Sequence, residues 1–391
     1  MPNRRARDLL EAALDRLPRE DQRNRALVLA RLAQVQHNEA SYERRRELAD
    51  EAVEVAQRLR IPGVLASALV ARNLALDGPD DVRHGIETGR EVRRLAARTH
   101  DLDLDLQGIR AMLPGLLATG AVDQAHQLAA EFMARAADVH PEHERIAAMW
   151  ATLWAGLRGE WDDLDARSSA LEASLRRSGH PQVDVIAWGQ RLPRRWLQGG
   201  MEHGRDLVAA LYATQPDYPV AQALQAMLDA STGNLDGVRR VRDEGRLREL
   251  DAFPPGFLWL PVVLATTVAA QALDDGAWAE HVYDVLFPHG YRHCVMGYTA
   301  YLGHGRHHLG VLAATAGRLD TAADHLATAL DEHDAVGARP FAALSAHELS
   351  RVLARRDGPG DAARAGELAE RRDAAMAEFG LGGPAFGQPP A

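Results

Sequence analysis

The chain has 391 residues, of which 46% are hydrophobic, 26% are charged and only 5% are aromatic. Its formal net charge of -10 argues against a direct nucleic-acid partner, because an acidic surface repels the phosphate backbone. All 45 basic residues are arginine, which excludes a Schiff-base lysine, a lysine general base and the Gly-Lys-Ser/Thr phosphate loop of ATPases.

Apolar residues recur at every third or fourth position from the start of the chain, as they do in amphipathic helices. The pattern is clear over residues 5–16, 25–35 and 47–59. The apolar run 257–273 is predicted to be a buried helix, because it is too short to span a bilayer. No run alternates apolar with polar residues over the length of a strand, so we expect no strands. The sequence predicts an all-α protein.

A small or polar residue followed by glycine recurs between the predicted helices, at intervals of about 34 to 43 residues between Gly120 and Gly317. Two helices in such a period are typical of a solenoid of helical hairpins, and residues 309–333 form the clearest hairpin. We therefore predict a tetratricopeptide-like α-α superhelix of roughly 18 or 19 helices. We expect one solenoid over residues 1–378, and a frayed glycine- and proline-rich tail over 379–391.

The most distinctive part of this pattern is the run GYTAYLGHGRHHLGVLAATAGRLDTAADHLATAL, followed by the hairpin GARPFAALSAHELSRVLARR, within residues 297–356. This run resembles the terminal repeats in the tetratricopeptide-like region of bacterial signal-transduction ATPases. That group includes the MalT-like and LuxR-type transcriptional regulators and the ATPase-cyclase fusions common in actinobacteria. Residues 257–279 and the first helices are similar to it more weakly. The resemblance implies a sensor arm that works with an ATPase or DNA-binding domain outside this chain.

Residues 287–310 hold five of the 17 histidines, three of the seven tyrosines and the only cysteine. We expect a helix over 298–316 that places Tyr301, His304 and His308 on one flank. Solenoids of helical hairpins bind ligands on their concave face, so we predict a polar and aromatic groove there. The candidate ligand-binding residues are His289, Tyr291, His293, Tyr298, Tyr301, His304, His308, Trp150 and Trp154. For the two tryptophans, packing between hairpins is the alternative.

A metal site is an alternative interpretation of the same histidines. His304 and His308 are four residues apart and would face one ion on a helix, with His289, His293 or Cys294 as further ligands. Because only two of these ligands are in register, we predict no metal and no cofactor. Cys294 is predicted to be an ordinary buried cysteine rather than a nucleophile.

These observations predict a non-enzymatic module that senses a ligand or interacts with proteins, and that binds a small molecule or peptide in its concave groove. We assign no catalytic residue. The alternative is a stand-alone biosynthetic enzyme that uses the histidines and tyrosines of 289–308 for acid–base chemistry. A protein–protein adaptor is a third possibility. A single cysteine and the absence of a spanning segment predict a cytoplasmic protein without a membrane partner.

Overall fold

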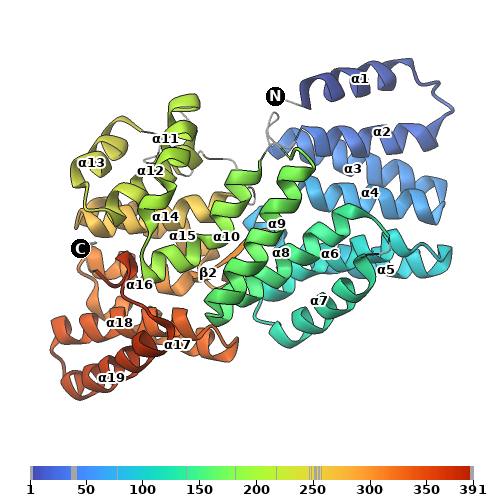
Figure 1. Cartoon of the computed structure of the whole chain (residues 1–391). Coiled ribbons are helices and arrows are strands. Elements are labelled where there is room, and N and C mark those ends of the chain that lie inside the picture. Colours follow the sequence, from blue (N-terminus) through green and yellow to red (C-terminus); the bar gives the residue numbers. More distant parts are fainter. Residues whose placement is uncertain are drawn as a thin grey trace. The chain divides into compact units, whose positions relative to one another are not determined.

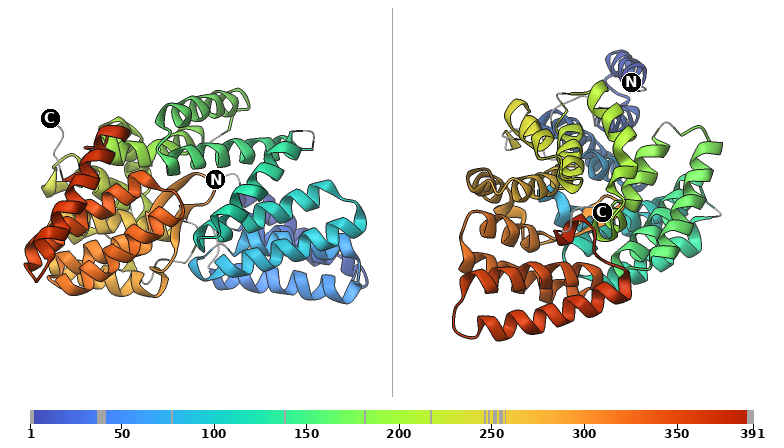
Figure 2. Two further views of the ribbon diagram at one scale, coloured as in Figure 1. Left: turned by 90° about the horizontal axis from the view of Figure 1, so that it is seen from below. Right: turned by 60° about the vertical axis from the view of Figure 1, so that its left-hand side comes forward.

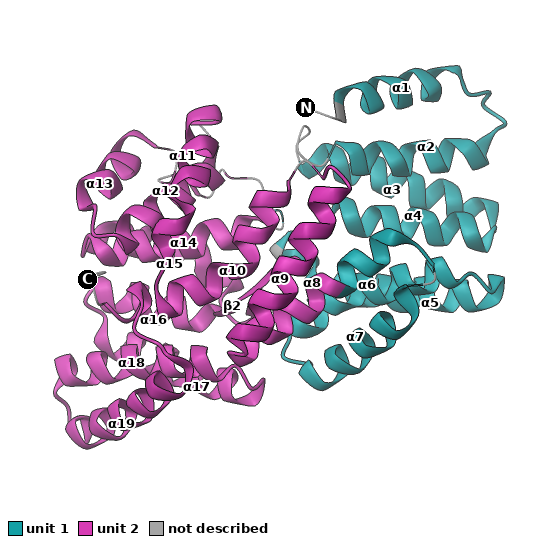
Figure 3. Ribbon diagram, viewed as in Figure 1, with its two compact units in different colours: residues 1–147, 254–257 teal, residues 148–253, 258–391 magenta. Residues whose placement is uncertain are grey.

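The computed structural model describes residues 3–36, 42–76, 78–137, 139–180, 182–216, 218–245 and 258–387, together with 247, 249, 250, 253 and 256. Two compact units divide the chain (Figure 3). Unit 1 holds the described residues up to Ala147, and unit 2 holds nearly all of those from Ala148 onward. The prediction of a single solenoid over 1–378 stays a prediction.

The described residues contain 19 α-helices, so the all-α prediction is confirmed for nearly all of them (Figure 1). The helices before the boundary are α1 (Asn3–Arg16), α2 (Gln22–Val35), α3 (Tyr42–Leu59), α4 (Pro62–Ala75), α5 (Val82–Thr99), α6 (Leu102–Ala118) and α7 (Val122–Ala136). The boundary falls within α8 (Pro141–Arg158). Unit 2 continues with α9 (Trp161–Arg177), α10 (Val183–Gln198), α11 (Arg205–Thr214), α12 (Pro219–Ser231), α13 (Leu235–Glu244), α14 (Trp259–Ala272), α15 (Gly276–Leu286), α16 (Gly305–Thr315), α17 (Leu319–Ala335), α18 (Arg339–Arg356) and α19 (Asp361–Phe379).

In both units, alternate helices of the chain pack against one another in series. In unit 1 each helix from α1 to α7 packs against the next, and α4 also packs against α2 and α6. In unit 2 the helices α12, α14, α16 and α18 pack in series, while α15, α17 and α19 pack against the neighbours of that series. Figures 1 and 2 show α17, α18 and α19 lying side by side at the C-terminal end of this series. Thus α2, α4 and α6 form one layer in unit 1, and α12, α14, α16 and α18 form one layer in unit 2.

The sequence explains which helices form which layer. The buried positions of α5, such as Gly85, Gly89, Val92 and Ala96, recur every three or four residues and cover one stripe. In contrast, α6 and α14 bury apolar residues around most of their circumference. A helix that is apolar on all sides must be covered on all sides. The predicted buried helix over 257–273 is confirmed as α14 within its described residues, 258–273.

Glycines in the left-handed region end several helices, as expected from the recurring turns. Gly120 has φ 76° and Gly317 has φ 80°. Among the recurring glycine turns predicted from the sequence, the turn before α15 differs. There the residue with positive φ is Asp274 (50°), and Gly276 is the first residue of the helix. Asp275 caps this helix through its carboxylate, which accepts the Trp278 N–H at 3.0 Å.

Two expectations differ from the structure. A two-stranded antiparallel sheet of β1 (His293–Met296) and β2 (Ala300–His304) lies in unit 2, so the expectation of no strands is wrong. The tail is not frayed over residues 380–387, because the Gly382 and Gly383 N–H groups donate to the Leu197 carbonyl and Phe386 is buried. Residues 388–391 lie outside the described part. Within that part, no helix has the length and apolar character needed to cross a bilayer.

Candidate functional site

Residues 287–304 are inserted between α15 and α16 of unit 2, whereas residues 336–338 suffice to join α17 to α18. The insertion begins with the 3-10 turn Phe287–His289 and continues into β1 and β2. Gly303 lies in the left-handed region at φ 93°, which an α-helix does not allow, so α16 starts only at Gly305. The predicted helix is therefore wrong over 298–304 and confirmed over 305–315.

The β-hairpin is part of the core of unit 2 rather than a surface arm. It packs against α10, α14, α16 and α17, and Figure 1 shows β2 beside α10. Each residue of β2 is buried. Tyr301 is 1% exposed, and its ring meets the edge of Phe341 with 4.9 Å between centroids.

His304 and His308 have different roles although they are four residues apart. His304 is the N-cap of α16, and its Nδ1 accepts the Arg306 N–H at 3.2 Å. His308 lies inside the helix, where its Nε2 donates to the Leu302 carbonyl at 3.3 Å and its ring stacks on Trp196. The expected common flank is therefore wrong, because the chain is extended up to His304 and helical only after it.

Hydrogen bonds link buried histidines of β2, α16 and α17, and a separate one links His293 of β1 to Tyr301. The His304 backbone N–H donates to Nε2 of His333 on α17 at 2.8 Å. Ser345 Oγ on α18 bonds Nδ1 of His333 at 3.1 Å and Nδ1 of His307 at 3.0 Å. His293 Nδ1 bonds the Tyr301 hydroxyl at 2.8 Å. We call these six residues the histidine cluster.

Burial keeps the imidazoles of the histidine cluster neutral. Desolvation lowers the pKa of His293 to about 4 and that of His304 to about 3. The pKa values of His307 and His333 also lie well below 6.5 for the same reason. Burial raises the pKa of the Cys294 thiol to about 12, so this side chain is a neutral thiol.

The remaining predicted residues lie in two other places. Trp150 packs against Trp154 and against Tyr298 of the turn between β1 and β2, with ring centroids 6.4 Å and 5.9 Å apart. His289 meets the edge of Trp259 at 5.0 Å, while Tyr291 is 58% exposed. The structure thus brings His293, Tyr301 and His304 together, and places the tryptophans and Tyr298 in a separate packed group.

Three residues that the fold brings to this segment from outside residues 287–310 are absent from the sequence predictions: His333 and Ser345 of the histidine cluster, and Glu332 of α17, which lies near His293. His333 continues the apolar stripe of Leu326 and Leu330 on α17, so a titratable residue at a core position of that helix was the available signal. Glu332 and Ser345 carry no such signal, because only the tertiary fold brings Glu332 to His293 and Ser345 to His307.

One ring nitrogen of His293, one of His304 and one carboxylate oxygen of Glu332 all lie within 4.8 Å of one another. His293 Nε2 is 3.7 Å from Glu332 Oε2, which is too long for a hydrogen bond. This nitrogen is buried without a hydrogen-bond partner among the described residues. Two imidazoles and a carboxylate are ligands that zinc accepts.

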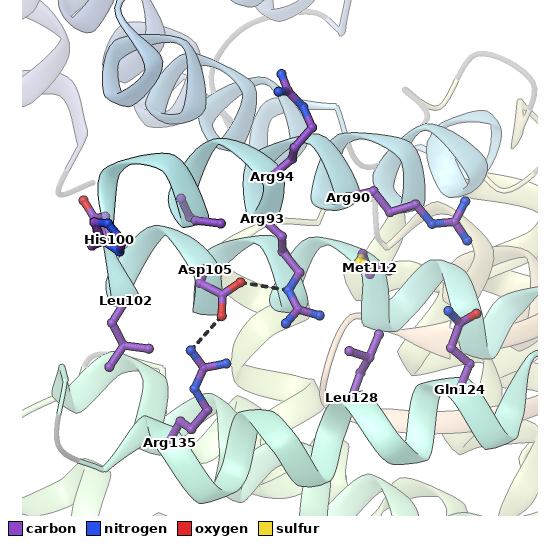
Figure 4. A pocket seen from close by; sticks show the side chains of 13 residues that line it. Arg90, Arg93, Arg94, His100, Leu102, Asp105, Met112, Gln124, Leu128 and Arg135 are labelled. Carbon is purple, nitrogen blue, oxygen red and sulfur yellow. Dashed lines mark hydrogen bonds and ion pairs between the residues drawn. The ribbon is translucent and has the colours of Figure 1, made fainter.

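A second candidate site is a pocket of about 800 Å³ in unit 1, formed by α5, α6 and α7. Figure 4 shows Arg93 and Arg135 both reaching Asp105, at 2.8 Å and 2.7 Å. Glu131 pairs with the same two guanidinium groups. Arg93 and Arg135 thus balance their charge with these carboxylates, while Arg90 and Arg94 also line the pocket.

Comparison of the sequence with family models and with curated proteins finds no relative. No family model matches the chain, and no curated protein matches its sequence. The resemblance to the repeats of signal-transduction regulators therefore stays a prediction.

Replacing Ser345 by alanine should lower the free energy of unfolding of unit 2 by about 1 to 3 kcal/mol, because His307 and His333 would each lose a buried partner. Urea denaturation of the full chain measures this loss. The matched control is Ser174→Ala on the exposed face of α9, which should stay within about 0.5 kcal/mol of wild type. Equal stability of the two variants would contradict a supporting role for the Ser345 hydroxyl.

Proposed function

We propose that this chain is a non-enzymatic helical-repeat module of the tetratricopeptide-like α-α superhelix class, and that it binds its ligand at the inserted segment 287–304 of unit 2. The ligand is a small molecule or a peptide. We further propose a role in bacterial signal transduction, in the cytoplasm, with an ATPase or DNA-binding domain outside this chain. The resemblance of residues 297–356 to the sensor repeats of such regulators supports this role.

The inserted segment is the observation that carries the proposal. In repeat proteins, insertions within a repeat tend to fall on the face that binds. Here the insertion replaces a short turn by a hairpin that is rich in histidine and tyrosine. Its first part is accessible, because Phe287 is 56% and Tyr291 is 58% exposed. The exposed Phe287 stacks on the buried Tyr283 with 5.6 Å between centroids, so its aromatic ring is held in place at the surface.

The protonation state of the histidine cluster favours binding over acid–base catalysis. A general acid or base works best when its pKa lies near the operating pH. The pKa of His293 lies at about 4 and that of His304 at about 3, and both rings are already hydrogen-bonded within the protein. A buried, neutral and bonded set of imidazoles suits a fixed binding surface better than proton transfer.

Thermal unfolding in the presence of a panel of metabolites and peptides tests the proposal. Compounds that raise the unfolding temperature of the wild type should lose at least half of that effect in the Phe287→Ala and Tyr291→Ala variants. Both side chains are exposed, so the fold should be retained. Leu9→Ala, at an exposed position of unit 1, should leave the effect unchanged.

Each stabilising compound should also be recovered unaltered after incubation with the protein. Chemical conversion of such a compound would contradict the non-enzymatic assignment and favour the acid–base alternative. Equal stabilisation of the wild type and all three variants would contradict binding at residues 287–304.

A further inference from the structure

We propose that His293, His304 and Glu332 form a binding site for a divalent transition-metal ion, and that zinc is the ion that fits this ligand set best. The inference deepens the proposed function and rests on it in placing a ligand at the inserted segment. It is carried by the convergence of one atom from each of the three residues within 4.8 Å. The sequence prediction of no metal considered His304 with His308, and the fold instead pairs His304 with His293.

His293 is oriented as a metal ligand. It faces His304 directly across the two strands, and the two rings are 4.8 Å apart. Its Nδ1 bonds the Tyr301 hydroxyl, and when Nδ1 carries the proton the lone pair is on Nε2. Nε2 is the buried nitrogen without a hydrogen-bond partner among the described residues, while the whole side chain is 1% exposed. A buried acceptor of this kind is costly unless something occupies it.

Glu332 supplies a negative charge to the proposed metal site and connects the site to solvent. It projects from α17 with 43% of its side chain exposed, and its Oε2 already lies 3.7 Å from His293 Nε2. Tetrahedral zinc with bonds of about 2.1 Å holds its ligand atoms about 3.4 Å apart, so this pair needs little movement. The partly exposed carboxylate leaves room on the solvent side for water as a further ligand.

His304 must give up one of its present hydrogen bonds in order to bind an ion. Its Nδ1 caps α16, and its ring also bonds the backbone carbonyl of Tyr291. An incoming ion would replace one of these hydrogen bonds with a coordinate bond. A neutral hydrogen bond contributes far less than a bond to zinc, so the exchange is favourable. We therefore expect the ion to tie the start of α16 to β1 and α17.

Two imidazoles and one carboxylate select the ion by class. Magnesium and calcium prefer sites made of oxygen ligands, whereas zinc and ferrous iron accept nitrogen together with oxygen. Cys294 does not contribute, since its sulfur contacts the Arg292 carbonyl and its thiol is neutral. The absence of a thiolate distinguishes this site from the cysteine-rich structural zinc sites.

The test is zinc binding by the full chain, measured by competition with a chromophoric chelator and by elemental analysis after dialysis. We expect one zinc per chain, with a dissociation constant of about 1 μM or lower. Glu332→Gln and His293→Gln should each weaken binding at least tenfold, and Tyr301→Phe, which removes the bond to Nδ1, should weaken it about tenfold or more. Bound cobalt should give the visible absorption of a nitrogen- and oxygen-ligated ion.

Asp331→Asn is the matched control, because it removes a carboxylate from the exposed neighbouring position of the same helix and should leave affinity unchanged. Glu332 is partly exposed, so its variant keeps the fold, and circular dichroism verifies this. No zinc on the wild type, or equal zinc on wild type and Glu332→Gln, would overturn the metal site. That result would leave the proposed function standing, provided that stabilisation by the compounds of the panel still depends on Phe287 and Tyr291.

Discussion

Replacing Gly89 by valine is expected to cost unit 1 about 3 kcal/mol or more of its free energy of unfolding. Gly89 on α5 faces Gly108 on α6, and these two helices pack backbone to backbone. A Cβ at Gly89 would meet the Gly108 carbonyl oxygen and the Met112 side chain. A Cβ at Gly108 would lie 2.9 Å from the Gly89 carbonyl oxygen. Because the obstacle is backbone on both sides, the helices must separate.

Urea denaturation followed by circular dichroism measures this effect. The matched control is Gly63→Val on α4, where a Cβ meets no atom within 4 Å. That variant should stay within about 1 kcal/mol of wild type, because it changes only the intrinsic propensity of the helix. If Gly89→Val unfolds at the same urea concentration as Gly63→Val, the close approach of α5 and α6 is wrong.

The second large effect is acid unfolding of unit 2. Burial lowers the pKa of His308 to about 4, whereas the unfolded chain has a value near 6.5. Since the folded pKa is the lower one, the unfolded state takes up the proton first, and stability falls as the pH drops from about 6.5 to 4. For His308 alone the loss is roughly 3 kcal/mol. Desolvation lowers the pKa of six further buried or partly buried histidines of unit 2: His293, His304, His307, His325, His333 and His347.

All of these histidines destabilise the folded state in the same pH range, so we expect unit 2 to unfold in acid as the pH falls from about 6.5 to 4. Glu348 acts in the opposite sense, because burial raises its pKa. The measurement is stability against pH in the presence of a chelator. His308→Gln should reduce the slope by about one proton, or 1.4 kcal/mol per pH unit near pH 5. The exposed control His203→Gln should not reduce it, and a flat profile between pH 6.5 and 4 would contradict the buried neutral cluster.

The sequence contains enough information to predict the helical architecture. The hairpin of α16 and α17 follows from the spacing of Leu309, Leu312, Leu326 and Leu330, and from the turn at Gly317. Helix periodicity is a local property, so it survives in the sequence without knowledge of the fold. The burial of α14 is visible because its sequence is apolar on nearly all sides of the helix.

The site is less predictable, for two physical reasons. β1 has four residues and β2 has five, which is too short for an alternating pattern to stand out from the helical pattern that follows. The ligand set also joins residues that are distant in the sequence, since Glu332 meets His293 only because α17 packs against β2. The segment 287–310 stands out in the sequence, and helical spacing pairs His304 with His308 there, whereas the fold places His304 next to His293.

The central claim is that the chain binds its ligand at the inserted segment of unit 2. Hydrogen–deuterium exchange of the full chain, with and without the strongest stabilising compound of the panel, tests it most directly. Binding at this segment should slow exchange in peptides covering residues 287–308 and the C-terminal half of α17. Slower exchange confined to α5, α6 and α7, around the pocket in Figure 4, would contradict it.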